Sequence, residues 1–150
     1  MKPDAIEVIN GIKQIIFNIL LPELQSEQAR GQVMYSAILL DHVIARLEIE
    51  PALLLEERAE LRALLTQARA VLGDDARVRE ALAASHEVPP SPRALDLAND
   101  HMRTLVPALA RELPGRSGEA VEELDAAIRA YIRNQHRRDQ QIVQVGGLAW

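Results

Sequence analysis

The chain has 150 residues, no cysteine and a formal net charge of -5, from 22 acidic and 17 basic residues. This length fits a single domain, and the lack of cysteine excludes disulfides, thiolate nucleophiles and thiolate metal sites. Because the charge is acidic and spread along the chain, nonspecific binding to nucleic acid or to an anionic membrane surface is not expected. We therefore expect a one-domain protein of the reducing cytoplasm.

The composition and its periodicity predict helices throughout. Hydrophobic residues make up 48% of the chain but aromatic residues only 3%, so a core would be built from leucine, isoleucine, valine and alanine, which favours packed helices over strands. Apolar residues recur at spacings of three and four nearly everywhere, without sustained alternation. The predicted fold class is all-α, a single bundle of five or six largely antiparallel helices.

The first predicted helix runs from an N-cap at Asp4 to about residue 21. Its apolar run "IIFNILLP" is short, contains Asn18 and ends at Pro22, which fits neither a secretory signal nor a membrane span. We expect four isoleucines to point inward from this helix: Ile9, Ile12, Ile16 and Ile19.

A second helix is predicted from about Ser26 to Ile49, followed by a break at Pro51 and a third helix to Leu72. The break is expected because a proline disfavours α geometry at the residue before it. The second helix is apolar over most of its circumference, which is typical of a central position in a bundle or of a subunit interface.

The second half of the chain contains the clearest predicted linker, "HEVPPSP" at residues 86–92. A helix over residues 93–113 follows, with a kink expected at Pro107. A last helix is predicted over residues 119–140, and a non-helical tail over about 141–150.

The most apolar predicted helix carries an adjacent acid and base, Asp41 and His42. Consecutive helical residues diverge by about 100°, so the two side chains cannot easily act on one atom. Asp41 is either a partly buried carboxylate suited to proton transfer or the ion-pair partner of an arginine, with Arg103 and Arg129 as possible partners. The ion pair is favoured, because a buried charge is tolerated mainly when it is paired.

His42 shares the outer face of the same helix with Tyr35 and Arg46. That face is a plain solvated edge or, alternatively, a surface that binds an anion or a second subunit. Together with Asp41, these side chains are the candidate ligand-binding residues.

Metal, cofactor and nucleophile chemistry find no support in the sequence. The four histidines, which are His42, His86, His101 and His136, lack the spacing of helical metal sites. No serine lies in a glycine-framed elbow with a histidine and an acid. We therefore predict no catalytic residue, no metal and no cofactor.

A basic cluster, "RNQHRRDQQ", lies near the end of the last predicted helix. Cations there offset the negative end of the helix dipole. An RNA-binding role for Arg133, Arg137 and Arg138 is the alternative, although only Tyr131 is near enough for base stacking. Nucleic acid is therefore an unlikely partner by sequence.

The segments "IEVINGIKQIIFNILLPELQ" and "ARGQVMYSAILLDHVIARLEIEPALLLEERAELRALL" resemble a family of small uncharacterised helical bacterial proteins. These tend to be encoded beside aminoglycoside-phosphotransferase-like kinases and acyl-CoA dehydrogenases. The likeness is in helix patterning: a first helix ending in Leu-Pro, a long second helix and a leucine-rich third. It implies an accessory role beside an acyl-CoA-handling enzyme or a phosphotransferase-like kinase.

The leading hypothesis is a non-enzymatic accessory or protein-interaction module that associates with itself, as a homodimer in the simplest case. Trp150, Ile38 and Tyr131 are the candidate interface residues, because aromatic and large apolar side chains are enriched at interfaces. The alternatives are a small-molecule binding protein or enzyme with a pocket inside the bundle near Asp41, and an RNA-binding module.

Overall fold

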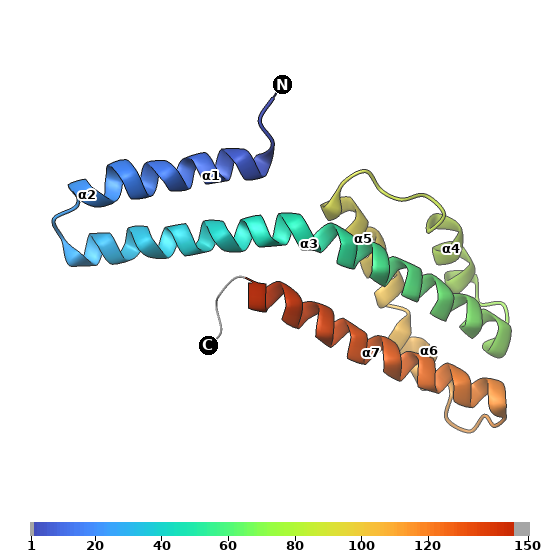
Figure 1. Ribbon diagram of the computed structural model, residues 1–150. Coiled ribbons are helices and arrows are strands. Elements are labelled where there is room, and N and C mark those ends of the chain that lie inside the picture. The colour runs from blue at the N-terminus through green and yellow to red at the C-terminus, as the bar shows by residue number, and fades with distance from the viewer. Residues whose placement is uncertain (1, 146–150) are drawn as a thin grey trace. The chain divides into compact units, whose positions relative to one another are not determined.

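The computed structural model describes residues 2–145, and every regular element within them is a helix (Figure 1). The prediction of an all-α chain is confirmed. In chain order the elements are α1 (Ala5–Ile15), η1 (Ile16–Leu20), α2 (Leu21–Glu23), α3 (Glu27–Leu72), α4 (Ala76–Ala84), α5 (Pro92–Arg103), α6 (Val106–Glu112) and α7 (Glu119–Val145).

Contacts divide the chain into two compact units. Unit 1 contains residues 1–50 and 139–150, and unit 2 contains residues 51–138. The long helices α3 and α7 contribute residues to both units.

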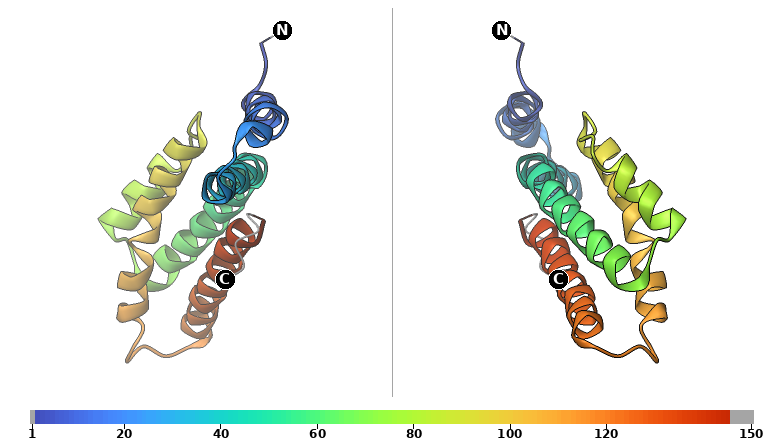
Figure 2. Two further views of the ribbon diagram at one scale, coloured as in Figure 1. Left: turned by 90° about the vertical axis from the view of Figure 1, so that its left-hand side faces the viewer. Right: turned by 90° about the vertical axis from the view of Figure 1, so that its right-hand side faces the viewer.

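Unit 1 contains a helical hairpin, in which α1, η1 and α2 run beside the first half of α3 (Figures 1 and 2). Asp4 caps α1 through a capping box: its side chain accepts from the Glu7 amide at 2.8 Å, and the Glu7 carboxylate accepts from the Asp4 amide at 3.0 Å. Two otherwise unpaired amides are satisfied in this way. The helix then widens into the π-helical turn η1, continues through Pro22 in the short helix α2, and ends at Leu24, whose backbone is extended.

The hairpin buries few apolar side chains. Among the described residues of unit 1, those below about a tenth exposure are Ile16, Ala37 and Ala45. Two of the four isoleucines predicted to point inward are instead exposed, Ile12 by 44% and Ile19 by 58%. That part of the prediction is wrong, because a two-helix hairpin covers only one narrow side of each helix.

The predicted break before Pro51 is also wrong, since α3 is one helix through that residue. A proline inside a helix removes one backbone hydrogen bond and costs about 3 kcal/mol or more. Strong helix formers follow it in "ALLLEERAELRALL", and their packing in the core of unit 2 offsets that cost.

The end of the chain differs from prediction at two places. The helix expected over 93–113 is divided into α5 and α6, and Pro107 lies in the first turn of α6, where its missing N–H has no partner to lose. The tail expected to be non-helical from about 141 continues α7 to Val145. No helix is assigned between His86 and Ser91, and Pro92 begins α5 with the Ser91 side chain as its N-cap.

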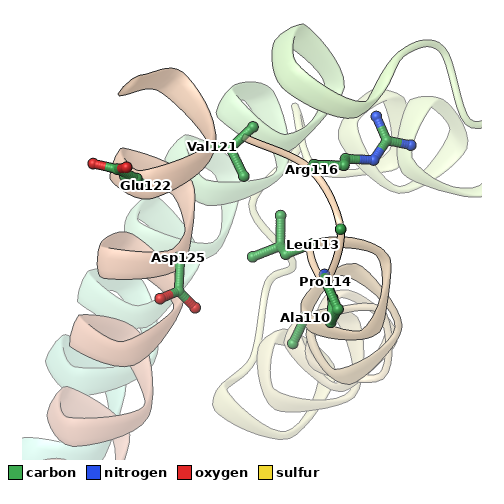
Figure 3. A pocket seen from close by; sticks show the side chains of 8 residues that line it. Ala110, Leu113, Pro114, Arg116, Val121, Glu122 and Asp125 are labelled. Carbon is green, nitrogen blue, oxygen red and sulfur yellow. The ribbon is translucent and has the colours of Figure 1, made fainter. Parts of the chain in front are cut away.

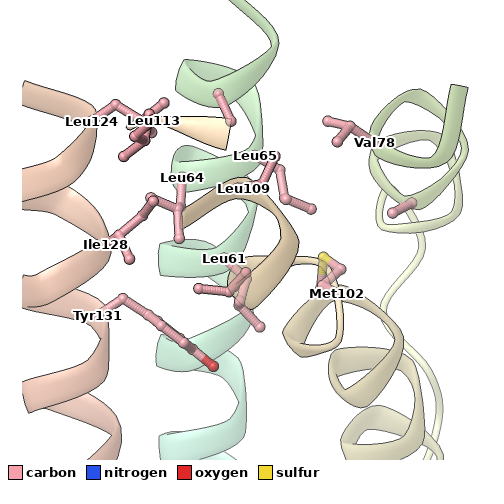
Figure 4. Close-up of a cluster of buried hydrophobic side chains, with 13 residues drawn as sticks. Leu61, Leu64, Leu65, Val78, Met102, Leu109, Leu113, Leu124, Ile128 and Tyr131 are labelled. Carbon is pink, nitrogen blue, oxygen red and sulfur yellow. The ribbon is translucent and has the colours of Figure 1, made fainter. Parts of the chain in front are cut away.

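Unit 2 has a continuous apolar core. Leucines of α3, at 61, 64 and 65, lie between α7 on one side and α4 and α5 on the other, with α6 beside them (Figure 4). The core consists of Leu61, Leu64, Leu65, Ala68, Val78, Ala81, Met102, Val106, Leu109, Leu113, Leu124, Ile128 and Tyr131. Most of these side chains lie three or four residues from another member of the core on the same helix, as the sequence pattern indicates.

Candidate functional site

Asp41 lies on the surface of the hairpin and pairs with a lysine. Its carboxylate accepts from the Lys13 ammonium of α1, and the Asp41 side chain is 56% exposed. The predicted ion pair is therefore present, but the predicted partners are wrong. Arg103 binds Glu57 and Asp96 instead, and Arg129 binds its own helix neighbour Asp125.

Replacing Asp41 with asparagine should change the free energy of unfolding by less than about 1 kcal/mol, because exposed ion pairs contribute little. Chemical denaturation of Asp41→Asn, Lys13→Gln and the double variant measures this as a double-mutant cycle. A loss of several kcal/mol for the aspartate alone would contradict the surface assignment.

The other predicted ligand-binding residues are spread over the outer face of α3. Arg46 donates to Glu50 at 3.0 and 2.7 Å, and Tyr35 is 48% exposed. His42 is half-buried, and its Nδ1 is buried without a hydrogen-bond partner among the described residues. The described contacts do not bring these side chains together in one ligand-binding site.

The three predicted interface residues have different surroundings. Ile38 is 41% exposed on α3. Tyr131 is only 5% exposed and belongs to the core of unit 2, so it is not available to a partner. Trp150 lies outside the described residues.

A buried polar network, which the sequence reading missed, is centred on Glu57 of α3. The side chain is 2% exposed. Arg103 of α5 donates to it from Nε at 2.7 Å and from Nη2, Tyr131 of α7 donates at 3.0 Å, and Asn99 of α5 donates at 3.3 Å. Asn99 also donates to the backbone oxygen of Leu54 at 2.8 Å. One carboxylate thus joins three helices.

The network is ionised and electrostatically compensated. Burial alone would raise the pKa of Glu57, but the hydrogen bonds and charge of Arg103, with the bonds from Tyr131 and Asn99, hold that pKa below its usual value. The bond to Glu57 raises the pKa of Arg103. Burial and the charge of Glu57 raise the pKa of Tyr131, so the phenol stays protonated.

A second polar cluster joins α3 to α7. Arg138 is 4% exposed at its side chain and donates to Glu60 at 2.8 Å, while Asn134 donates to the same carboxylate at 2.7 Å. The Arg138 guanidinium also lies 5.8 Å from the centre of the Tyr131 ring, within cation–π range. Arg137 pairs with Glu56 at 3.3 Å. Two of the three arginines considered for RNA binding are therefore engaged by carboxylates.

The close-up in Figure 3 shows a shallow hollow in unit 2, between the end of α6 and the first turns of α7. Ala110, Leu113, Pro114 and Val121 form its apolar side, and Arg116, Glu122 and Asp125 lie around it. Asp125 already accepts from Arg129 at 2.9 Å. The hollow is open to solvent and offers no enclosed, preorganised set of polar groups of the kind that small-molecule sites use.

The described part of the chain contains no group of three or more histidine, aspartate or glutamate side chains placed to hold a metal ion. The donors and acceptors of the Glu57 network are hydrogen-bonded to one another. The network therefore stabilises unit 2 and does not present a reactive group. Sequence patterning could have indicated it: Glu57 stands three residues after Leu54 and four before Leu61, on the inward stripe of the helix.

No family model, curated protein or solved structure matches the chain. The likeness to small helical bacterial proteins, and the partners it implies, therefore stay predictions from the sequence.

Among the described residues, the stretch Ala5–Glu23 is long and apolar enough to cross a membrane, with a mean hydropathy of 1.3. A core helix or a signal sequence meets the same criterion of length and composition. Only 6% of the stretch is buried, and its side chains Val8, Ile12, Ile15 and Ile19 are each at least 44% exposed.

Proposed function

We propose that the protein is a self-association module, in which the hairpin of unit 1 pairs with the same surface of a second copy. The observation that carries this proposal is the largely uncovered apolar surface of Ala5–Glu23. No enzymatic function is proposed, since the clusters centred on the Glu57 and Glu60 carboxylates are paired internally.

The first contribution to this surface is a stripe along α1 and η1. Its members, which are Val8, Ile12, Ile15 and Ile19, are between 44% and 58% exposed. They are spaced by four, three and four residues, so they lie on one side of the helix. Isoleucine and valine side chains in such a row gain free energy only when another apolar surface covers them.

A second stripe runs along the first half of α3. Tyr35, Leu39, Val43 and Leu47 are each between 41% and 48% exposed and are spaced by four residues. Ile38, one of the predicted interface residues, lies beside this stripe. The hairpin thus carries one apolar stripe on each of its two helices.

The area is large enough for a stable dimer. The two stripes present roughly 600 Å² of apolar surface per copy, and a specific interface needs about 1,000 Å² from the two partners together. Monomeric proteins rarely expose apolar patches of more than about 300–600 Å².

A second copy suits this surface better than a lipid bilayer does. Two antiparallel helices with one stripe each can pair with an identical hairpin around a two-fold axis, which forms a four-helix arrangement. Helices that lie on membranes rely on lysine and arginine beside the apolar face, whereas Lys13 of α1 is bound to Asp41. A bilayer spanned by Ala5–Glu23 would also leave the α3 stripe uncovered.

Sedimentation equilibrium of the full chain, from about 1 µM to about 100 µM, tests the proposal. We expect a monomer–dimer equilibrium with the dimer dominant at the upper end. A monomer over the whole range would overturn self-association. Flotation with neutral and anionic vesicles completes the test, because vesicle binding by a monomeric chain would assign the apolar stripes to a membrane instead.

A further inference from the structure

A buried arginine in unit 2 lacks an anionic partner among residues 2–145, which the structure describes. Arg58 of α3 is 4% exposed. Its Nη1 donates to the Asn99 side-chain oxygen at 3.3 Å and its Nη2 to the backbone oxygen of Glu87 at 2.6 Å. Both acceptors are neutral, and Nε is buried with no acceptor among the described residues.

The other well-shielded arginines of the polar clusters are compensated. Arg103 has Glu57 and Asp96, and Arg138 has Glu60 and Glu56. For Arg58 no carboxylate among the described residues lies within salt-bridge distance. A buried charge without a counter-charge costs several kcal/mol, so such a group is expected to acquire an anion.

A second cation lies one helical turn further along α3. Arg62 is half-buried, and its Nη2 lies 3.4 Å from Nδ1 of His86, which lies in the turn after α4. Within the described chain Arg62 has no carboxylate partner either. Burial and the charge of Arg62 lower the pKa of Arg58, which reflects the proximity of two like charges.

We propose that Arg58, Arg62 and His86 form a binding site for a small oxyanion of the phosphate class, either free phosphate or a phosphomonoester. The planar guanidinium groups match the geometry of phosphate oxygens and supply charge-assisted hydrogen bonds. Because Nδ1 of His86 faces the Arg62 donor, its Nε2 is the ring nitrogen left to donate to the anion. The exposed His86 and half-buried Arg62 give access from solvent. Glu87 contributes its backbone oxygen here, and its own side chain is exposed.

Isothermal titration of the full chain with inorganic phosphate and, separately, with glucose 6-phosphate tests this site, with chloride keeping ionic strength constant. We expect saturable binding of at least one of the two probes, weakened at least about tenfold in Arg62→Gln. Arg62 is half-buried and outside the apolar core, so this variant keeps its fold, which far-UV circular dichroism verifies. Arg79→Gln is the matched control, since Arg79 is exposed and already bound to Asp74.

Binding of phosphate assigns the site to the free anion, and binding of glucose 6-phosphate alone assigns it to a phosphomonoester. The absence of saturable binding to either probe would overturn the proposal, as would equal binding by the wild type and Arg62→Gln. The proposed anion site lies in unit 2 and goes beyond the proposed self-association through unit 1. A failure to bind either phosphate probe would therefore leave the sedimentation result unaffected.

Discussion

Replacing Glu57 with glutamine should lower the free energy of unfolding by about 2–3 kcal/mol, measured by urea denaturation. The glutamine keeps the shape but removes the charge that compensates Arg103. The expected loss is smaller than the 3–5 kcal/mol typical of a fully buried pair, because Arg103 is 24% exposed and also has Asp96. Glu56→Gln is the matched control on the same helix, since Glu56 is 53% exposed, and should cost less than about 1 kcal/mol.

The pH dependence gives this prediction a second measurement. The pKa of Glu57 is lowered by folding, so its contribution to stability is complete above the ordinary carboxyl pKa of about 4.3 and is lost as the pH falls through the lower folded value. The stability difference between wild type and Glu57→Gln should therefore shrink in acid. A difference that is negligible at neutral pH, or that grows on acidification, would contradict the network as described.

The network also shows what sequence patterning can and cannot resolve. The period of three and four places Glu57 on the inward side of its helix, and the same period gives the leucines of the unit 2 core. It cannot identify Arg103 and Tyr131 as partners, because they lie 46 and 74 residues further along the chain. Partner choice across helices depends on packing order, which a local period does not contain.

The predicted helix boundaries were wrong at two prolines, because a proline can have two different roles in a helix. A proline costs a helix interior one hydrogen bond but suits a first turn. Pro51 takes the first role inside α3 and Pro107 takes the second in α6, the reverse of what the sequence suggested. For Pro51, the residues that follow it pack in the core of unit 2, and this packing offsets the lost hydrogen bond.

Asp41 lies on the exposed side of a two-helix hairpin, which explains why the arginines predicted as its ion-pair partners were wrong. The sequence indicates an ion pair for a carboxylate beside an apolar stripe. In the structure the hairpin brings Lys13 of the preceding helix to that position. The nearest helix in sequence supplied the partner, whereas the prediction assumed a closed bundle.

Placing glutamates at Ile12 and Ile15 together should raise the dimer dissociation constant at least about 100-fold, equivalent to about 2.7 kcal/mol. Both side chains belong to the exposed stripe of α1, at 44% and 50% exposure. In the two-fold dimer of the proposed function, four carboxylates would then lose water on association without gaining partners. Glutamate is a strong helix former, so the hairpin itself should remain helical.

The matched control for this variant is Leu97→Glu with Ile132→Glu. These side chains are 64% and 57% exposed, yet they lie in unit 2 and outside both stripes. Sedimentation equilibrium should give the control pair the dissociation constant of the wild type. If the control weakens the dimer as strongly as the stripe variant, added charge in general opposes association and the α1 stripe is not the interface. If neither variant weakens it, the copies meet through another surface.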